Sequence, residues 1–203
     1  MAIKLSETFQ INAPIEDVWR FLLTPERVVT CMPGAELQEK VDEQTFLGLI
    51  KVKVGPIVTR YQGRVQFVER DDAAHHVRLV AEGREKDGSG SAKGGMASTL
   101  RSVSAEVTEV AVESEVEITG RVMQFGRGMI ESVSQQLFQQ FVAATRETLE
   151  RPAEERAAME AAPPEPHEAK PINGILLVLK VVWSWVAGFF RGLFGRGKKR
   201  RGA

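Results

Sequence analysis

The sequence contains few of the residues that build disulfides, metal centres and most catalytic sites. Its 203 residues include one cysteine, Cys31, and three histidines, so no disulfide can form within the chain. A lone cysteine is typical of a reducing compartment. The N-terminal residues, Met-Ala-Ile-Lys-Leu-Ser-Glu, also lack the apolar run and small-residue cleavage site of a signal peptide. We therefore expect the body of the protein to stay in the cytoplasm.

The few candidates for catalysis or metal binding have no partners at suitable spacing. His75 and His76 lie in a predicted hairpin turn beside two aspartates, but no third ligand is placed to complete a metal site. Cys31 has no histidine near it, which favours a small buried role over a nucleophilic one. Residues 88–95 resemble a phosphate loop, but no glycine precedes Lys93 and no serine or threonine follows it. We predict no catalytic residue and no metal ligand.

The formal net charge of zero conceals an uneven distribution. Residues 172–203 contain seven basic residues and no acidic one. The rest of the chain therefore has 20 basic residues against 27 acidic ones, a net charge of −7. Because a body with surplus acid repels polyanions, we do not expect nucleic-acid binding.

The composition divides the chain into three regions. Residues 1–150 alternate between strand and helix periodicities, as a globular domain does. Residues 151–171 are rich in proline, alanine and glutamate and contain no aromatic or β-branched residue. Such a segment cannot bury enough apolar surface to offset the entropy lost on ordering, so we predict a flexible linker. Residues 172–203 form a basic tail rich in aromatic residues.

Within the body, apolar residues recur at strand spacing in some stretches and at helix spacing in others. A first strand is predicted over residues 3–11, followed by short helices after Pro14 and from Pro25 to about Pro33. Further strands are predicted over residues 46–54, 57–67, 77–83, 97–107 and 112–122. An apolar arc of about half the circumference predicts a long helix over residues 128–149. This order predicts an α+β domain, a curved antiparallel sheet around a long C-terminal helix.

A set of short motifs runs through residues 3–150. They are Ala13-Pro14 with Val18-Trp19, Cys31-Met32-Pro33-Gly34-Ala35, Val52-Lys53-Val54-Gly55-Pro56, Gly63, Gly94-Gly95-Met96-Ala97, Gly120 and Gly126. These motifs resemble those of the carbon monoxide dehydrogenase G-subunit family, which is part of the START-like (SRPBCC) superfamily of helix-grip proteins. The first motif marks the superfamily only, whereas the Cys31–Ala35 and Val52–Pro56 motifs together are more specific.

The resemblance implies an apolar cavity between the sheet and the terminal helix. It also implies association with molybdenum carbon monoxide dehydrogenase and binding of a membrane quinone, menaquinone or ubiquinone. Tyr61 is the only tyrosine, and because a buried hydroxyl needs a partner we take it as a candidate to bond a quinone carbonyl. Flexible methionines suit an isoprenoid tail, although spacing alone fits an ordinary core as well. The predicted cavity residues are Met32, Phe46, Tyr61, Phe67, Met96, Phe125, Met129, Val133, Leu137 and Phe141.

The tail carries the strongest single signal for a membrane. Residues 175–190 are almost entirely apolar, but sixteen helical residues span about 24 Å, less than the ~30 Å hydrocarbon core. A spanning helix, which stays the alternative, would carry six basic residues across the bilayer against the positive-inside tendency. We predict an amphipathic helix lying peripherally on anionic lipids at the cytoplasmic face of the inner membrane. The predicted membrane-binding residues are Lys180, Trp183, Trp185, Phe189, Phe190, Arg191, Phe194, Arg196, Lys198, Lys199, Arg200 and Arg201.

These features together predict a non-catalytic accessory protein that binds quinone and recruits the dehydrogenase to the membrane. Two alternatives stay open: a tether or assembly factor without a ligand, and a helix-grip enzyme such as a cyclase or hydrolase. The enzyme is the less favoured of the two, because no histidine is paired with a carboxylate or a nucleophile at a catalytic spacing.

Overall fold

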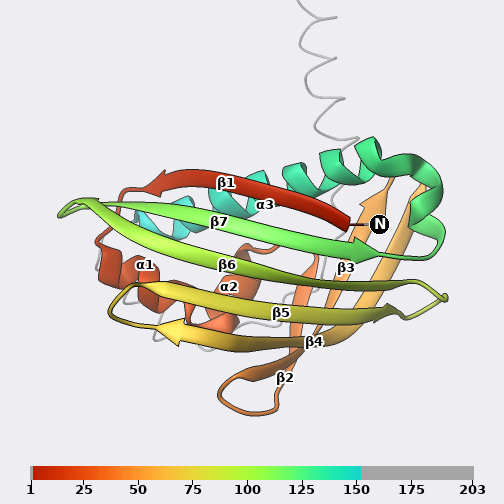
Figure 1. Cartoon of the computed structure of the whole chain (residues 1–203), viewed down its shortest axis with the longest axis horizontal. Coiled ribbons are helices and arrows are strands. Elements are labelled where there is room, and N and C mark those ends of the chain that lie inside the picture. Colours follow the sequence, from red (N-terminus) through yellow and green to blue (C-terminus); the bar gives the residue numbers. More distant parts are fainter. Residues whose placement is uncertain (1, 152–203) are drawn as a thin grey trace, which may run out of the picture. The chain divides into compact units, whose positions relative to one another are not determined.

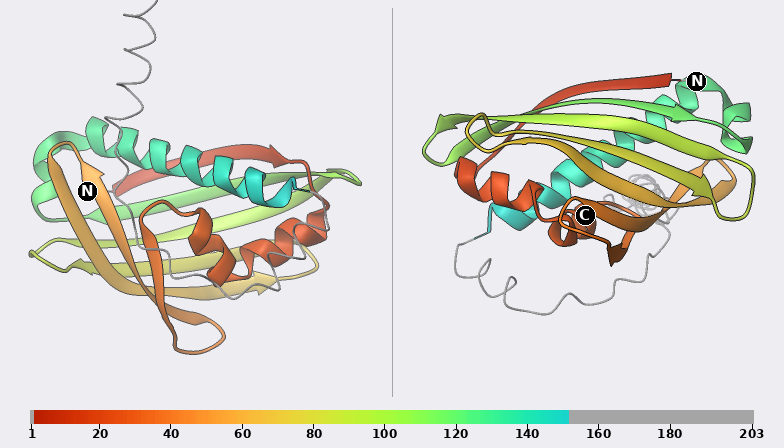
Figure 2. Two further views of the ribbon diagram at one scale, coloured as in Figure 1. Left: turned by 180° about the vertical axis from the view of Figure 1, so that it is seen from behind. Right: turned by 60° about the horizontal axis from the view of Figure 1, so that its bottom comes forward.

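The structure, a computed structural model, describes residues 2–151. They form a curved seven-stranded antiparallel sheet that carries its helices on one face (Figures 1 and 2). The strand order is β1-β7-β6-β5-β4-β3-β2. The elements are β1 (Ala2–Ile11), α1 (Ile15–Leu22), α2 (Pro25–Cys31), β2 (Ala35–Lys40), β3 (Thr45–Val54), β4 (Ile57–Asp71), β5 (His76–Glu85), β6 (Ser91–Ser104), β7 (Val107–Ile118), the 3-10 helix η1 (Arg121–Phe125) and α3 (Gly126–Leu149). The predicted linker, apart from Arg151, and the predicted tail lie outside the described residues.

The predicted helices and the curved antiparallel sheet are confirmed. The carbonyl oxygen of Pro14 accepts hydrogen bonds from the amides of Asp17 and Val18 at 3.0 and 3.2 Å, so α1 begins directly after the proline. Pro25 occupies the first turn of α2, where its missing N–H is not needed. The terminal helix starts two residues earlier than predicted and ends at Leu149, as expected.

The boundary between the sixth and seventh strands differs from the prediction. The sequence predicted strands over residues 97–107 and 112–122, whereas β6 ends at Ser104 and β7 already begins at Val107. The tight turn between them contains no glycine or proline, and it is closed by the Ser104 hydroxyl, which accepts the Glu106 amide at 3.4 Å. At its other end, β7 stops before Gly120, whose φ of +93° turns the chain into η1.

The edge strand β2 was not predicted. Its sequence, Ala-Glu-Leu-Gln-Glu-Lys, contains only two apolar residues; its first half is partly buried and its last three residues are exposed. A bulge between Leu37 and Glu39 interrupts its pairing with β3. Polar, bulged edges of this kind protect a sheet from pairing with other chains.

The main core lies where α1 and the C-terminal half of α3 meet the sheet. Val18 and Phe21 on α1 are completely buried. The core cluster consists of Ile11, Ala13, Val18, Trp19, Phe21, Cys31, Val77, Leu100, Val110, Val112 and Leu149. The two short helices pack at this end, whereas η1 and the start of α3 lie at the opposite end of the same face of the sheet.

The first of the two motifs that make the family resemblance specific packs against the strand that leads into the second. The carbonyl oxygen of Gly34 accepts a hydrogen bond from the amide of Lys51 at 2.8 Å. Gly34 has φ +76°, and a Cβ there would collide with the Lys51 carbonyl oxygen. Only glycine fits both constraints. The Cys31–Ala35 motif is therefore packed against β3, the strand that ends in the Val52–Pro56 motif.

Candidate ligand-binding site

The two faces of the sheet differ sharply in character. Along β4, Thr59 and Tyr61 are buried, whereas Arg60 and Gln62 between and after them are exposed. The buried positions belong to the face that the helices cover, here called the inner face (Figure 2). Several of its apolar side chains are only partly buried, namely Ile50, Val65, Leu79, Met96 and Val116. The inner face therefore keeps accessible apolar surface.

A buried carboxylate stands on this face at the end of β5. The Glu85 side chain is only 2% exposed, and Glu85 is the register partner of Tyr61 on β4. Its Oε1 accepts hydrogen bonds from the Thr59 hydroxyl at 2.9 Å and from Arg121 Nη2 at 2.7 Å. Its Oε2 accepts the Gly90 amide at 3.1 Å. The carboxylate thus joins three segments: β4, the β5–β6 turn and η1.

These contacts hold Glu85 in its charged form. The hydrogen bond from Arg121 is the largest cause that lowers the pKa of Glu85, and the Thr59 hydroxyl adds to it, while burial opposes both. In return, Glu85 raises the pKa of Arg121. The guanidinium and the carboxylate neutralise each other, so the cluster carries no net charge.

Small residues make room for the carboxylate. A Cβ on Gly90 would stand 2.7 Å from Glu85 Oε2 and 2.9 Å from the Thr119 carbonyl oxygen. A Cβ on Gly88 would likewise collide with the Glu85 carboxylate. These glycines lie in the turn between β5 and β6, and they are there because the chain folds back over a buried side chain.

The Tyr61 hydroxyl is the exceptional group in this cluster. Tyr61 is 9% exposed, and its hydroxyl oxygen is buried without a hydrogen-bond partner among the residues that the structure describes. Thr59 lies close enough to lower the pKa of Tyr61 in part, but its hydroxyl does not reach hydrogen-bonding geometry with the tyrosine. Burial is the larger effect and raises that pKa, so the phenol keeps its proton. A buried hydroxyl without a partner is a donor available to a ligand.

The start of α3 lies against the β3–β4 hairpin. At Gly55, with φ +57°, a Cβ would stand 3.4 Å from Phe125 Cε1 and 3.6 Å from Met129 Sδ. Met129 is nevertheless 43% exposed, which is high for a large apolar side chain. The Val52–Pro56 motif therefore meets the helix beside an accessible methionine.

The structure brings part of the predicted cavity set together. Phe46 and Phe67 stack edge to face on the inner face, with ring centroids 6.0 Å apart. Phe67, Met96 and Phe141 pack against the main core cluster, as core residues do. Val133 and Leu137 are partly buried on α3, and Met32 directly follows α2. Whether these ten residues line a ligand stays a prediction.

Glu85, Thr59 and Arg121 were missed by sequence analysis. Arg84-Glu85-Lys86-Asp87 has the composition of a solvated turn, and nothing in it marks one carboxylate as buried. The pairing of Glu85 with Tyr61 depends on strand register, which the sequence pattern did not specify.

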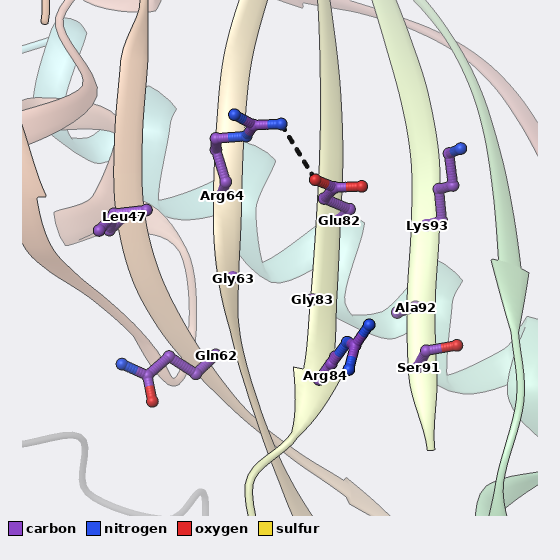
Figure 3. Close-up of a pocket in the computed structure, with 10 residues that line it drawn as sticks. All are labelled: Leu47, Gln62, Gly63, Arg64, Glu82, Gly83, Arg84, Ser91, Ala92 and Lys93. Carbon is purple, nitrogen blue, oxygen red and sulfur yellow. Dashed lines mark hydrogen bonds and ion pairs between the residues drawn. The ribbon is translucent and has the colours of Figure 1, made fainter. Parts of the chain in front are cut away.

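Two open depressions lie on the opposite, outer face of the sheet, with volumes of about 470 and 440 Å³. Charged side chains surround the first, and Figure 3 shows Arg64 paired with Glu82 at 3.1 Å, with Arg84 and Lys93 nearby and α3 behind the sheet. Of the predicted cavity residues, only Met96 is among those lining either depression. Neither of these two depressions is the apolar site between sheet and terminal helix that the sequence predicted.

His75 and His76 lie at the end of the β4–β5 turn and the start of β5. His75 Nε2 lies 3.3 Å from Glu16 Oε1, and His76 Nδ1 lies 2.9 Å from the Thr99 hydroxyl. Within residues 2–151, no three histidine, cysteine or acidic side chains gather closely enough to hold a metal ion. Over the same residues, none of the helices has the length and apolarity to cross a membrane. All predicted membrane-binding residues lie outside the described part of the chain.

A long helix held by a curved antiparallel sheet, with two short helices after the first strand, defines the helix-grip fold of the START-like class. Solved structures agree with this assignment at the level of fold. A conserved protein from Geobacillus kaustophilus is 17% identical with a TM-score of 0.66, covering 73% of this chain and 95% of its own. The Zhui aromatase/cyclase from Streptomyces sp. R1128 is 15% identical with a TM-score of 0.57, covering 74% and 95%. A START superfamily protein from Mycobacterium smegmatis is 11% identical with a TM-score of 0.52, covering 72% and 97%.

The family is defined by sequence. The profile of CoxG, the G-subunit of carbon monoxide dehydrogenase, matches residues 8–150, and the chain belongs to this family. Membership makes it a helix-grip protein associated with carbon monoxide dehydrogenase. A comparison with curated proteins finds no match.

Proposed function

We propose that the protein is a non-catalytic carrier that binds a membrane quinone between the sheet and α3 and recruits carbon monoxide dehydrogenase to the cytoplasmic face of the membrane. The observation that carries the proposal is the Tyr61 hydroxyl, which is buried on the inner face without a hydrogen-bond partner among residues 2–151. A quinone carbonyl is the type of acceptor that such a hydroxyl lacks.

The surroundings of Tyr61 support an elongated apolar ligand. Ile50 and Val65 beside it on the inner face keep accessible apolar surface, and Met129 at the start of α3 is 43% exposed. Burying such surface against an isoprenoid tail contributes roughly 25 cal/mol for each Å² removed from water. The polar ring would then lie at Tyr61, with the tail extending along α3.

The tail supplies the membrane contact in this proposal. Its aromatic residues favour the headgroup boundary, and its basic residues favour anionic lipids. The predicted linker would give the body a reach of about 25 Å from the membrane surface. A body tethered in this way would collect quinone at the bilayer and present it to the enzyme.

The direct test is to purify the full chain from a host whose membranes contain quinone, extract the lipids bound to the protein and analyse them by mass spectrometry. The expected result is a quinone recovered with the wild-type chain and strongly reduced with Tyr61→Phe. The matched control is Thr145→Val in the last part of α3, which removes the other hydroxyl that is buried without a partner within residues 2–151. Absence of quinone from the wild-type extract would contradict the proposal.

A tether or assembly factor without a ligand is the second candidate. This candidate is supported by three predicted cavity residues that pack against the core, as they would in a domain without a ligand cavity: Phe67, Met96 and Phe141. A chain ending at Arg151 separates the two functions. If the protein is a quinone carrier, we expect this truncated chain still to stimulate quinone reduction by the dehydrogenase in detergent. If it is only a tether, we expect no stimulation.

A further inference from the structure

Three connections of the chain meet at the end of the body that contains Glu85 (Figures 1 and 2). They are the β3–β4 hairpin, the β5–β6 turn, and η1 with the first turn of α3. The hairpin lies against η1 and α3, because a Cβ on Gly55 would stand 3.4 Å from Phe125 Cε1 and 3.6 Å from Met129 Sδ. The ion pair between Glu85 and Arg121 joins the turn to η1. Residues 53–60, 84–91 and 119–131 are here called the η1 end.

The η1 end exposes apolar side chains on two of these connections. Val58 on the hairpin is 46% exposed and Met129 on α3 is 43% exposed. Pro56, at the tip of the hairpin, is exposed as well. Single exposed apolar residues are common on protein surfaces, but these three lie on segments that contact each other through Gly55. Together they form an apolar rim around this end of the inner face.

The charged residues of the η1 end leave a surplus of cations. Its three acidic residues are each paired with an arginine: Glu85 with Arg121 at 2.7 Å, Asp87 with Arg60 at 3.6 Å and Glu131 with Arg127 at 2.7 Å. The three other basic residues, Lys53, Arg84 and Lys86, are exposed and have no acidic partner among residues 2–151. The η1 end therefore has six basic residues against three acidic ones.

The opposite end of the body has the reverse balance of charge. The segments that gather there, residues 12–31, 69–76, 101–109 and 146–151, contain ten acidic residues and six basic ones. The helix α3 adds to the asymmetry, because the positive end of a helix dipole is its N-terminus and α3 begins at the η1 end. A negatively charged surface therefore attracts the η1 end and repels the other end of the body.

We infer that the η1 end is the part of the body that touches an anionic membrane and admits the lipid ligand. The inference rests on the proposed function, in which a quinone is taken up from the bilayer. Cations without acidic partners attract anionic headgroups, and the apolar rim fits the boundary between headgroups and acyl chains. Tyr61 is the register partner of Glu85, so a ligand that enters at this end has a short way to the Tyr61 hydroxyl. Because the body as a whole has surplus acid, the contact requires the predicted tail to hold the chain at the membrane.

The predicted linker is long enough for this orientation. It begins at residue 151, just after α3 ends at Leu149 on the side of the body opposite η1. α3 has 24 residues, so its two ends lie about 36 Å apart. Residues 151–171 extend to at most about 70 Å. A chain whose tail is bound to the membrane can therefore still turn its η1 end toward the bilayer.

The test places a fluorophore at each end of the body in the full chain. Cys31→Ser removes the buried native thiol, and Met129→Cys or Ala105→Cys then provides a single exposed labelling site. Ala105 lies in the β6–β7 turn, at the end opposite η1. Each labelled protein is mixed with phosphatidylglycerol vesicles that contain a nitroxide-labelled lipid as quencher. We expect the label at position 129 to lose most of its fluorescence and the label at position 105 to lose little. Val58→Cys repeats the measurement on the hairpin if Met129→Cys folds poorly.

A pair of double variants tests the role of charge. Each basic residue near an anionic surface contributes up to about fivefold in affinity, so Lys53→Gln with Lys86→Gln should reduce quenching at position 129 severalfold. Sedimentation with the vesicles should persist, because the tail is unchanged. The control is Lys40→Gln with Arg78→Gln, two exposed cations away from the η1 end, which should leave the quenching as it is.

Three results would overturn the inference. They are quenching at position 105 that equals or exceeds that at position 129, a full chain that does not sediment with the vesicles, and a label at position 129 that is shielded by the dehydrogenase but not quenched by the vesicles. If quinone is still recovered in the lipid extract described above, any of these results leaves quinone binding intact. A quinone-free extract would instead contradict the proposed function itself.

Discussion

At the scale of single residues, Glu85 explains features that look unrelated in the sequence. Gly88 and Gly90 lie where a Cβ would collide with its carboxylate. Gly120, with φ +93°, brings Arg121 round to meet it. One buried charge therefore accounts for the glycines of the β5–β6 turn and for the sharp bend before η1.

The pH dependence of stability should report on this carboxylate. Because the folded-state pKa of Glu85 is depressed, its contribution is present above the ordinary glutamate pKa of about 4.3 and is lost as the pH falls through the lower folded value. We expect Glu85→Gln to lower the thermal midpoint at pH 7, since Arg121 then loses its counter-charge. The difference from wild type should shrink below about pH 4. A gap that stays constant from neutral to acid pH would show that Glu85 does not titrate as its contacts require.

Gly90 offers a second test at the same scale. In Gly90→Ala the new methyl group would stand 2.7 Å from Glu85 Oε2, so the turn or the carboxylate must move. Overpacking of this kind costs about 1–3 kcal/mol, measured by urea unfolding. Gly128→Ala is the control, because nothing lies within 4 Å of its added Cβ on α3. That change should be neutral or stabilise by up to about 1 kcal/mol, and a larger loss there than at Gly90 would contradict the account.

At the scale of elements, α1 fixes one end of the domain. The Trp19 indole N–H donates to Asp72 Oδ1 at 2.9 Å, and its ring meets His75 edge to face at 5.4 Å. These contacts join α1 to the β4–β5 turn, while Phe21 of the same helix is buried in the core. The helix therefore closes the end of the inner face opposite Glu85.

Removing the Phe21 ring should show how much this end contributes. We expect Phe21→Ala to lower the free energy of unfolding by about 3–5 kcal/mol, because a completely buried ring leaves a cavity. Val58→Ala on β4 is the control, since Val58 is 46% exposed and should cost about 0.5 kcal/mol or less. Chemical denaturation of both variants gives the comparison, and similar losses for the two would contradict the burial assignment.

The elements were more predictable from sequence than the site. Strands such as β5 alternate between covered and exposed positions, and proline marks the starts of α1 and α2, so local rules suffice. The polar edge strand β2 and the glycine-free turn before β7 carry no such local signal. In the candidate site, Tyr61 was identified because it is the only tyrosine. Glu85 was not, because its partners come from β4, the β5–β6 turn and η1, which only the three-dimensional fold brings together.

At the scale of the whole molecule, the family domain and the basic tail occupy separate parts of the chain. The family profile matches residues 8–150 and therefore ends where the predicted linker begins. Residues 172–203 contain seven basic residues and no acidic one. We expect a chain that ends at Arg151 to keep the thermal midpoint of the full chain, measured by circular dichroism, because it retains every core contact described above.

The same truncation should abolish binding to anionic vesicles. The full chain is expected to co-sediment with phosphatidylglycerol vesicles and far less with phosphatidylcholine, since each basic residue near an anionic surface contributes about 1 kcal/mol. Binding should weaken as salt shortens the Debye length from about 10 Å at 0.1 M to about 3 Å at 1 M. Replacing Lys198, Lys199, Arg200 and Arg201 by glutamine would separate charge from the aromatic contribution of Trp183 and Trp185. If the truncated chain sedimented with these vesicles as well as the full chain does, the body would be the membrane-binding part and the tail would need another role.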